Sequence, residues 1–265
     1  MQNVIRRLRN IKIQGASSIA LHSLLYLRGI AARKGFGAAF ERECRNLLVA
    51  RPTAVDLYNC IRIMKKEKSL SAIDRLMDEI RQSRHVVAEK AEPLFRRRRV
   101  ILTHCHSSYV TAAIIMHKRK VRRVIVTETR PKNQGMITAK ELLSKNVKID
   151  YIIDSASGAF MKNTDFVLVG ADALRKEGVI NKIGTYPIAI VAREQKKPVY
   201  VATSLLSVDK RKGFTMEQRP VSEVARLKRA HVHNPAFDIT PWRYVTGIVT
   251  EKGIENPPCF VRKYL

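Results

Sequence analysis

The chain has 265 residues and carries 50 Lys and Arg against 23 Asp and Glu, a formal net charge of +27. Hydrophobic residues make up 45% of it, which excludes a disordered or collagen-like chain. The length fits one large α/β domain or a helical domain joined to a larger one. The four cysteines, at 44, 60, 105 and 259, form no C-x-x-C pair, so neither a disulfide framework nor a zinc site is predicted.

The basic excess is spread along the whole chain. Residues 1–100 hold 22 basic and 9 acidic residues, a net of +13, and residues 101–265 hold 28 and 14, a net of +14. Because no aromatic-rich stacking motif accompanies these charges, we expect nucleic-acid binding to be weak and non-specific at most. No stretch of about 18 apolar residues is present, so we expect a soluble protein without a membrane span. The cysteine spacing suggests reduced thiols in an intracellular protein, which we expect to be cytoplasmic.

Residues 1–92 show a helical pattern. Apolar residues recur at three-to-four spacing in two stretches: Val4, Ile5, Leu8 and Ile11, and then Ile73, Leu76, Met77 and Ile80. The segment Arg51-Pro52-Thr53 interrupts the middle of this region, as proline does inside a helix. We therefore predict an N-terminal helical domain over 1–92.

After Pro93 the pattern changes to short Val- and Ile-rich runs that alternate with helical stretches. The predicted strands are Val100–His104, Val124–Thr127, Ile149–Ile153, Phe166–Val169, Val199–Ala202 and Tyr244–Thr250. The predicted helices are Ser107–Arg119, Ala139–Ser144 and Pro187–Lys196. This alternation indicates an α/β domain over 93–265 with a mostly parallel sheet. Ligands of such sheets bind beyond the carboxyl ends of the strands, so the polar residues there are the candidates for function.

The first predicted strand leads through Cys105 directly into a helix. The positive end of a helix lowers the pKa of a nearby thiol and favours a reactive thiolate, whereas the alternative is a small buried apolar residue. His104 and His106 flank this cysteine, but no third ligand stands at a recognisable spacing. We therefore predict no metal site.

The second predicted strand leads to Arg130 and Gly135. An arginine at this position either grips a phosphate or pairs with Glu128, and a glycine permits close approach of the backbone to a ligand.

The fourth predicted strand is followed by Asp172 at a partly desolvated rim, where the pKa of a carboxyl group rises enough for proton transfer; the alternative role is to cap the next turn. Asn181 and Lys182 precede a Gly184-Thr185 helix start that is typical of an anion-binding loop. Asp238 either caps a turn or lines the same pocket.

Seven segments, in order along the chain, resemble the translation initiation factor 2B α/β/δ superfamily. They are Gln14-Gly15-Ala16-Ser17, Arg51-Pro52-Thr53-Ala54-Val55, Ile101-Leu102-Thr103-His104-Cys105, Val126-Thr127-Glu128-Thr129-Arg130-Pro131, Val169-Gly170-Ala171-Asp172, Asn181-Lys182-Ile183-Gly184-Thr185 and Asn234-Pro235-Ala236-Phe237-Asp238-Ile239-Thr240-Pro241. Enzyme members of this superfamily include ribose-1,5-bisphosphate and methylthioribose-1-phosphate isomerases. Since a cleavable leader would remove Gly15, the resemblance also argues against one, although the first forty residues contain no Asp or Glu.

The resemblance implies a helical domain followed by a Rossmann-like domain, in a homodimer or homohexamer that binds a sugar phosphate and needs no cofactor. It assigns Cys105 as the base at C2 of the sugar, and Asp172 as the group that opens the ring and handles the oxygen protons. The implied substrate-binding residues are Gln14, Gly15, Ala16, Arg51, Ser107, Arg130, Gln134, Gly135, Asn181 and Lys182.

Two functions are compatible with this resemblance. Isomerases of the superfamily carry both the cysteine and the aspartate, as this chain does at Cys105 and Asp172, whereas many regulatory subunits lack one or both. The segment Glu128–Pro131 resembles the archaeal ribose-1,5-bisphosphate enzymes more than the methylthioribose ones. The alternative is a non-catalytic subunit that binds translation components or senses sugar phosphates or nucleotides. Two features are compatible with it: the net charge of +27, and the segment Ala202–Leu206, where relatives often have Glu-Ser/Thr-aromatic-Lys-Phe. A nucleic-acid-binding Rossmann protein is a third, weaker hypothesis that depends on charge alone.

Overall fold

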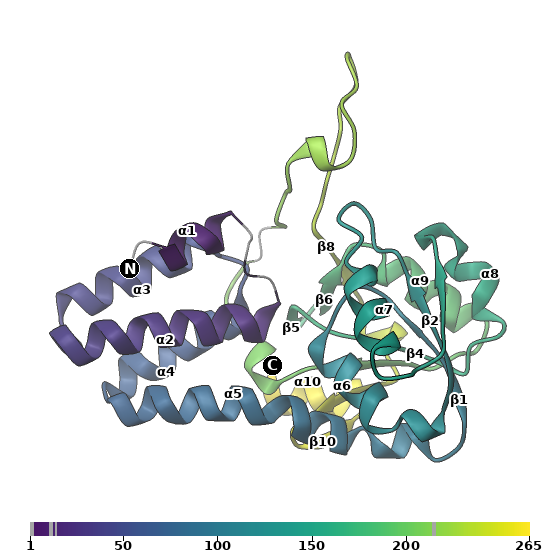
Figure 1. The fold of residues 1–265 in the computed structure, drawn as a ribbon, viewed down its shortest axis with the longest axis horizontal. Coiled ribbons are helices and arrows are strands. Elements are labelled where there is room, and N and C mark those ends of the chain that lie inside the picture. Colours follow the sequence, from purple (N-terminus) through teal and green to yellow (C-terminus); the bar gives the residue numbers. More distant parts are fainter. Residues whose placement is uncertain (1–2, 11–12, 14, 214–215) are drawn as a thin grey trace.

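The first part of the chain is a bundle of helices. The computed structural model describes residues 3–10, 13, 15–213 and 216–265. The bundle contains α1 (Asn3–Arg9), α2 (Ala16–Lys34), α3 (Ala38–Ala50), α4 (Val55–Glu67) and α5 (Leu70–Lys90). Their apolar faces form one core, which includes Leu24, Leu57 and Ile73. The long α5 passes beneath both parts of the molecule, as Figure 1 shows, and its last turns pack on the sheet.

The second part is built on a seven-stranded sheet with the order β10-β9-β7-β4-β1-β2-β3. Its strands are β1 (Arg99–Thr103), β2 (Val121–Thr127), β3 (Ile149–Ile152), β4 (Phe166–Val169), β7 (Val199–Ala202), β9 (Gly247–Thr250) and β10 (Gly253–Glu255). All neighbouring pairs are parallel except β9 with the edge strand β10. Consequently β1, β2, β3, β4, β7 and β9 all direct their carboxyl ends to the same side.

Helices cover both faces of this sheet, because successive strand residues point to opposite sides. Ile101 packs in the core under α5, α6 (Ser108–Met116) and α7 (Gly135–Leu143). The next residue, Leu102, packs in the core under α8 (Ser157–Met161), α9 (Thr185–Glu194) and α10 (Pro257–Tyr264). The molecule is therefore an α/β protein with a three-layered second part. No helix among the described residues is long and apolar enough to cross a membrane.

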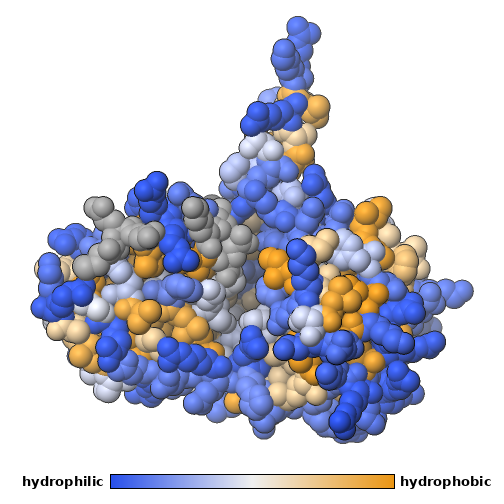
Figure 2. All heavy atoms as spheres, in the orientation of Figure 1, coloured by the Kyte–Doolittle hydropathy of each residue, from blue (hydrophilic) through white to orange (hydrophobic). Residues whose placement is uncertain are grey.

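A small antiparallel sheet adjoins the carboxyl edge of the main one. It has the order β5-β6-β8 and consists of β5 (Ala173–Arg175), β6 (Gly178–Lys182) and β8 (Phe237–Thr240). Between β7 and β8 the chain forms an arm that projects from the body at the top of Figure 1. Hydrophilic residues cover much of the helical part, the sheet part and the arm on the face shown in Figure 2.

The predicted α/β class and mostly parallel sheet are confirmed, and each of the six predicted strands overlaps a strand of the main sheet. The predicted helices correspond to α6, α7 and α9. The structure also contains a hairpin that the sequence analysis does not predict: β5 and β6 pair over residues 173–182, so Asn181 and Lys182 lie on a strand rather than in an anion-binding loop. The boundary predicted after residue 92 falls between α5 and β1, and the division into two domains there stays a prediction.

Candidate active site

The ends of β1 and β2 are joined through Cys105 and Thr129. The backbone N–H of Cys105 donates to Thr129 Oγ1 at 2.8 Å. Both residues have left-handed backbones, with φ of 68° and 62°. Such a conformation is unfavourable for residues other than glycine, so it persists only where surrounding contacts hold it. The Cys105 carbonyl is held as well, because it accepts a hydrogen bond from Thr138 Oγ1 at 3.0 Å.

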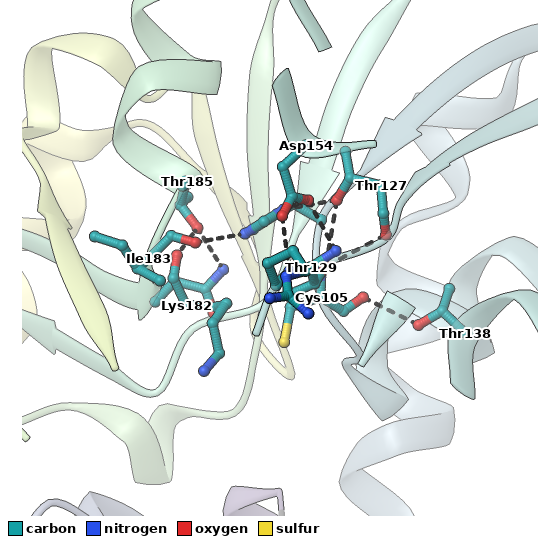
Figure 3. Close-up of polar contacts among 12 residues, drawn as sticks. Cys105, Thr127, Thr129, Thr138, Asp154, Lys182, Ile183 and Thr185 are labelled. Atoms are coloured by element: carbon teal, nitrogen blue, oxygen red, sulfur yellow. Dashed lines mark hydrogen bonds and ion pairs between the residues drawn. The ribbon is translucent and has the colours of Figure 1, made fainter. Parts of the chain in front are cut away.

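Asp154, which follows β3, holds the turn after β2. Its two carboxylate oxygens accept from the backbone N–H groups of Thr129 and Arg130 at 2.8 and 2.7 Å. These are charge-assisted bonds, the stronger kind of hydrogen bond. The ends of β1, β2 and β3 therefore form one connected polar cluster, and Cys105 projects from it (Figure 3).

Three charged residues from separate parts of the chain lie in the region of the Cys105 thiol. Asp172 lies between β4 and β5, Lys182 ends β6, and Arg51 follows α3. The charges of Lys182 and Asp172 both act on the thiol, and those of Lys182 and Arg51 act on the Asp172 carboxylate. Figure 3 shows the Cys105 sulfur and the Lys182 ammonium extending to the same side of the cluster. The fold thus brings together Cys105, Asp172, Lys182 and Arg51, four of the predicted residues.

The prediction that the helix end lowers the pKa of Cys105 is wrong. Burial raises the pKa of this thiol to about 12, and the nearby Lys182 ammonium only partly offsets that effect. A thiolate loses the solvation that water gives it, and one cation with the first turn of α6 does not replace it. Cys105 is therefore a neutral thiol at neutral pH.

Burial also raises the pKa of Asp172, to about 6. The cations Lys182 and Arg51 oppose this rise, while the charge of Glu217 adds to it. The direction agrees with the one predicted from the position of Asp172 at the strand end. Because this pKa lies just below neutrality, the carboxyl group exchanges a proton readily at physiological pH.

Two further predicted binding residues make contacts within the protein that give them a structural role. Asn181 is buried, and its amide donates to Thr185 Oγ1 at 3.0 Å at the start of α9. Gly135 packs against the end of β2, where a Cβ would lie 1.8 Å from the Thr127 carbonyl oxygen. Its N–H donates to the Glu128 carbonyl at 3.1 Å, so close backbone packing accounts for this glycine. Contact of either residue with substrate stays a prediction.

The other predicted binding residues lie at helix starts or on the surface. Ser107 precedes α6 and touches Gly170, Gln134 precedes α7, and Gly15 and Ala16 stand at the start of α2. Arg130 is exposed, and its guanidinium donates to the Pro131 carbonyl at 3.4 Å. Gln14 lies outside the described residues. Substrate contact by this group also stays a prediction.

Asp238 has the capping role that was one of its two predicted alternatives. It accepts from the N–H groups of Gly184 and Tyr186 at 2.8 and 3.0 Å, at the start of α9.

Sequence reasoning did not assign a role to Asp56 or Asp154. Asp56 lies buried at the start of α4, where burial raises its pKa to about 7, and it accepts from Ser207 Oγ at 2.9 Å. The Arg51-Pro52-Thr53 segment, which resembles a family segment, could have drawn attention to the nearby Asp56. No sequence feature pointed to a role for Asp154.

A basic cavity of about 800 Å³ is lined in part by Arg51. Its other charged lining residues are Arg9, Arg211, Lys212 and Glu217. Four cations against one carboxylate suit an anionic group. Within the described part of the chain, no three His, Cys, Asp or Glu side chains group closely enough to hold a metal ion.

Comparison with known proteins identifies the family. The family model described as "Initiation factor 2 subunit family" matches residues 12–257. The chain belongs to this family. It is 36% identical over 278 residues to ribose 1,5-bisphosphate isomerase of Haloferax volcanii, covering 94% of this chain and 86% of that protein. It is 33% identical over 298 residues to methylthioribose-1-phosphate isomerase of Geotalea uraniireducens, covering 96% and 86%.

A solved structure of the family has the same fold. The Pyrococcus horikoshii OT3 protein described as translation initiation factor eIF-2B superposes with a TM-score of 0.87 at 28% identity, covering 98% of each chain. The family thus includes relatives named as enzymes and relatives named as initiation factors, and the site residues must decide between them.

Proposed function

We propose that the protein is a sugar-phosphate aldose–ketose isomerase that converts ribose 1,5-bisphosphate to ribulose 1,5-bisphosphate. The observation that carries this proposal is the pairing of Cys105 with Asp172 beside two cations at the carboxyl edge of the sheet. One half-buried thiol and one half-buried carboxyl group are the two proton-transfer groups that the reaction needs. The names of the relatives support the same reaction class.

The two groups hold one proton between them at neutral pH, since Cys105 is a thiol and Asp172 is mostly ionised. Transfer of that proton from Cys105 to Asp172 gives a thiolate base and a carboxylic acid together. Asp172 then protonates the ring oxygen as the bond from C1 to that oxygen breaks. Cys105 removes the proton from C2 and returns it to C1, while Asp172 accepts the proton of the C2 hydroxyl. These steps leave a thiolate and a carboxylic acid, and return of the proton from Asp172 to Cys105 restores the starting thiol and carboxylate. The protons therefore balance without another reactant.

The cations favour a bisphosphate over a sugar with one phosphate. Arg51, Arg9, Arg211 and Lys212 line the basic cavity, which has room for a phosphate group. An uncharged 5-substituent such as a methylthio group gains nothing from these cations. We therefore propose that the substrate carries a phosphate on C5 as well as on C1.

The test is a comparison of three substrates: α-ribose 1,5-bisphosphate, methylthioribose 1-phosphate and ribose 1-phosphate. Ketose formation is followed with wild-type protein and with Cys105→Ser as the chemical control. We expect kcat/KM for the bisphosphate to exceed the other two by at least 100-fold. Turnover of methylthioribose 1-phosphate with equal kcat/KM would contradict the assigned substrate, and absence of all turnover would contradict the reaction.

The likeness to the Pyrococcus horikoshii protein, described as an initiation factor, favours one alternative, a non-catalytic subunit. It predicts no turnover and sugar-phosphate or nucleotide binding that is independent of the Cys105 thiol.

For both functions we expect a homodimer or homohexamer, which light scattering after gel filtration measures. We also expect RNA and DNA to bind only weakly and without sequence preference, and binding that survives 0.5 M salt would contradict this.

A further inference from the structure

We propose that His104 is a positioning residue, whose imidazole joins the end of β1 to the turn after β6 and thereby fixes Lys182 relative to Cys105. His104 immediately precedes Cys105, and its hydrogen-bond partner Ile183 immediately follows Lys182. One side chain therefore connects the two strand ends that carry the thiol and the ammonium. The inference goes beyond the proposed reaction and rests on it only for the importance of Cys105.

The imidazole is enclosed and both of its nitrogens are used. His104 is 2% exposed. Nε2 lies 2.8 Å from the Ile183 carbonyl oxygen, and Nδ1 lies 2.7 Å from Thr127 Oγ1. The ring packs so closely on the turn that a Cβ on Gly184 would lie 3.0 Å from it. Figure 3 shows Thr127 and Ile183 on opposite sides of the site.

The partners determine where the ring proton is. A carbonyl oxygen only accepts, so Nε2 carries the hydrogen and donates to Ile183. In a neutral ring Nδ1 is then an acceptor, and the Thr127 hydroxyl donates to it. Burial lowers the pKa of His104, and the Lys182 charge also lowers it. The bond to Ile183 and the Asp154 carboxylate, 3.8 Å from Nδ1, raise the pKa but do not outweigh burial. The ring is therefore neutral, with one fixed tautomer.

This arrangement makes His104 unsuitable as an acid or base toward substrate, because neither nitrogen is available to it. Its effect on the site runs through Lys182, whose charge lowers the pKa of the Cys105 thiol against the effect of burial. Of the two hydrogen bonds of the imidazole, the one from Nε2 to Ile183 restrains Lys182. The bond from Thr127 to Nδ1 restrains the ring on the β2 side.

Two substitutions separate these two hydrogen bonds. The amide of His104→Gln reaches the Nε2 position and keeps a donor for Ile183, whereas His104→Asn keeps an acceptor near Nδ1 and has no group at the Nε2 position. Thr127→Val is the matched control, since it removes the donor to Nδ1, together with the 3.3 Å contact to Thr129 Oγ1, and leaves the bond to Ile183 in place. Folding of each variant is checked by circular dichroism and thermal melting.

The readout is the rate of Cys105 alkylation by iodoacetamide at pH 9, followed by mass spectrometry of the Cys105 peptide. Each background is measured with and without Lys182→Met, so that changes in access to the thiol cancel in the ratio. We expect Lys182→Met to slow alkylation at least threefold in wild type, His104→Gln and Thr127→Val, and less than 1.5-fold in His104→Asn. An equal ratio in all four backgrounds would overturn the proposal. Because this readout needs no turnover, it stands or fails independently of the isomerase assignment.

Discussion

The N–H of Cys105 donates to the hydroxyl of Thr129, and both residues have left-handed backbones. This contact joins two adjacent strand ends and sets the direction in which the thiol leaves the sheet. The conformational cost at both residues is offset by hydrogen bonds from Thr138 to the Cys105 carbonyl and from the Thr129 N–H to Asp154. The site is therefore held by backbone contacts rather than by the thiol itself.

Removing the Thr129 hydroxyl should destabilise the protein. In Thr129→Val the N–H of Cys105 loses its acceptor, which costs about 1–3 kcal/mol for a buried group. Thr129→Ser keeps the oxygen and is the matched control. Urea denaturation measures the free energy of unfolding of each variant, and equal values for Val and Ser would contradict this role.

Cys105→Ser and Asp172→Asn should each lower kcat by about 10²- to 10⁴-fold, because each removes one proton-transfer group. Serine has a much higher pKa than cysteine, and asparagine cannot exchange a proton. Binding should remain within about threefold, since Arg51 and Lys182 are unchanged in both variants. Steady-state kinetics and calorimetric titration with the bisphosphate measure the two effects.

The double variant Cys105→Ser/Asp172→Asn should be little slower than either single one, since both groups serve one proton-transfer sequence. Fully additive losses in kcat would show that the two groups act independently. Cys105→Ser activity within about threefold of wild type would show that the thiol is a packing residue.

Activity should fall as the pH drops through about 6, because Asp172 becomes protonated there while Cys105 still carries its own proton. Above pH 6 the pair holds one proton, and kcat should stay level to pH 9, because the thiol has its pKa at about 12. Carbon-13 NMR of labelled aspartate, compared with Asp172→Asn, identifies the titrating carboxyl group directly. A resonance assigned to Asp172 that titrates near pH 4 would contradict this account.

Asp56→Asn should stabilise the protein at neutral pH. The raised pKa of Asp56 means that the unfolded chain loses this proton near pH 4, whereas the folded chain keeps it to about pH 7. Stability of the wild type therefore falls between these values, by up to about 4 kcal/mol. Asparagine avoids this loss and still accepts from Ser207.

The test of this stabilisation is the difference in melting temperature between Asp56→Asn and wild type at several pH values. It should grow from pH 4 to 7 and then level off. The exposed Asp78→Asn is the control and should show no such growth. A difference for Asp56→Asn that is constant with pH would contradict a buried proton on this carboxyl group.

Six of the seven strands of the main sheet could be predicted because they are short runs rich in Val and Ile, whereas the short edge strand β10 was missed. Sequence reasoning also missed the β5–β6–β8 sheet, whose three-to-five-residue strands include charged residues such as Arg175 and Lys182 and carry no alternating pattern. It placed Cys105 and Asp172 at strand ends correctly, since parallel strands share one carboxyl edge. The thiol pKa was predicted wrongly because burial of Cys105 is a property of the assembled site. The contacts of His104 and Asp154 could not be predicted because their hydrogen-bond partners lie 23 to 79 positions away in the sequence.

The most direct test of the central claim is incubation of the protein with α-ribose 1,5-bisphosphate, carbon-13 labelled at C1 and C2, in D₂O. NMR then reports both bond-making and proton exchange in one sample. The account predicts a C2 ketone signal, together with some deuterium at C1 of the product, and both should form about 10²- to 10⁴-fold more slowly with Cys105→Ser. Wild-type protein that binds the sugar yet forms no ketone and exchanges no C2 proton would contradict the isomerase assignment.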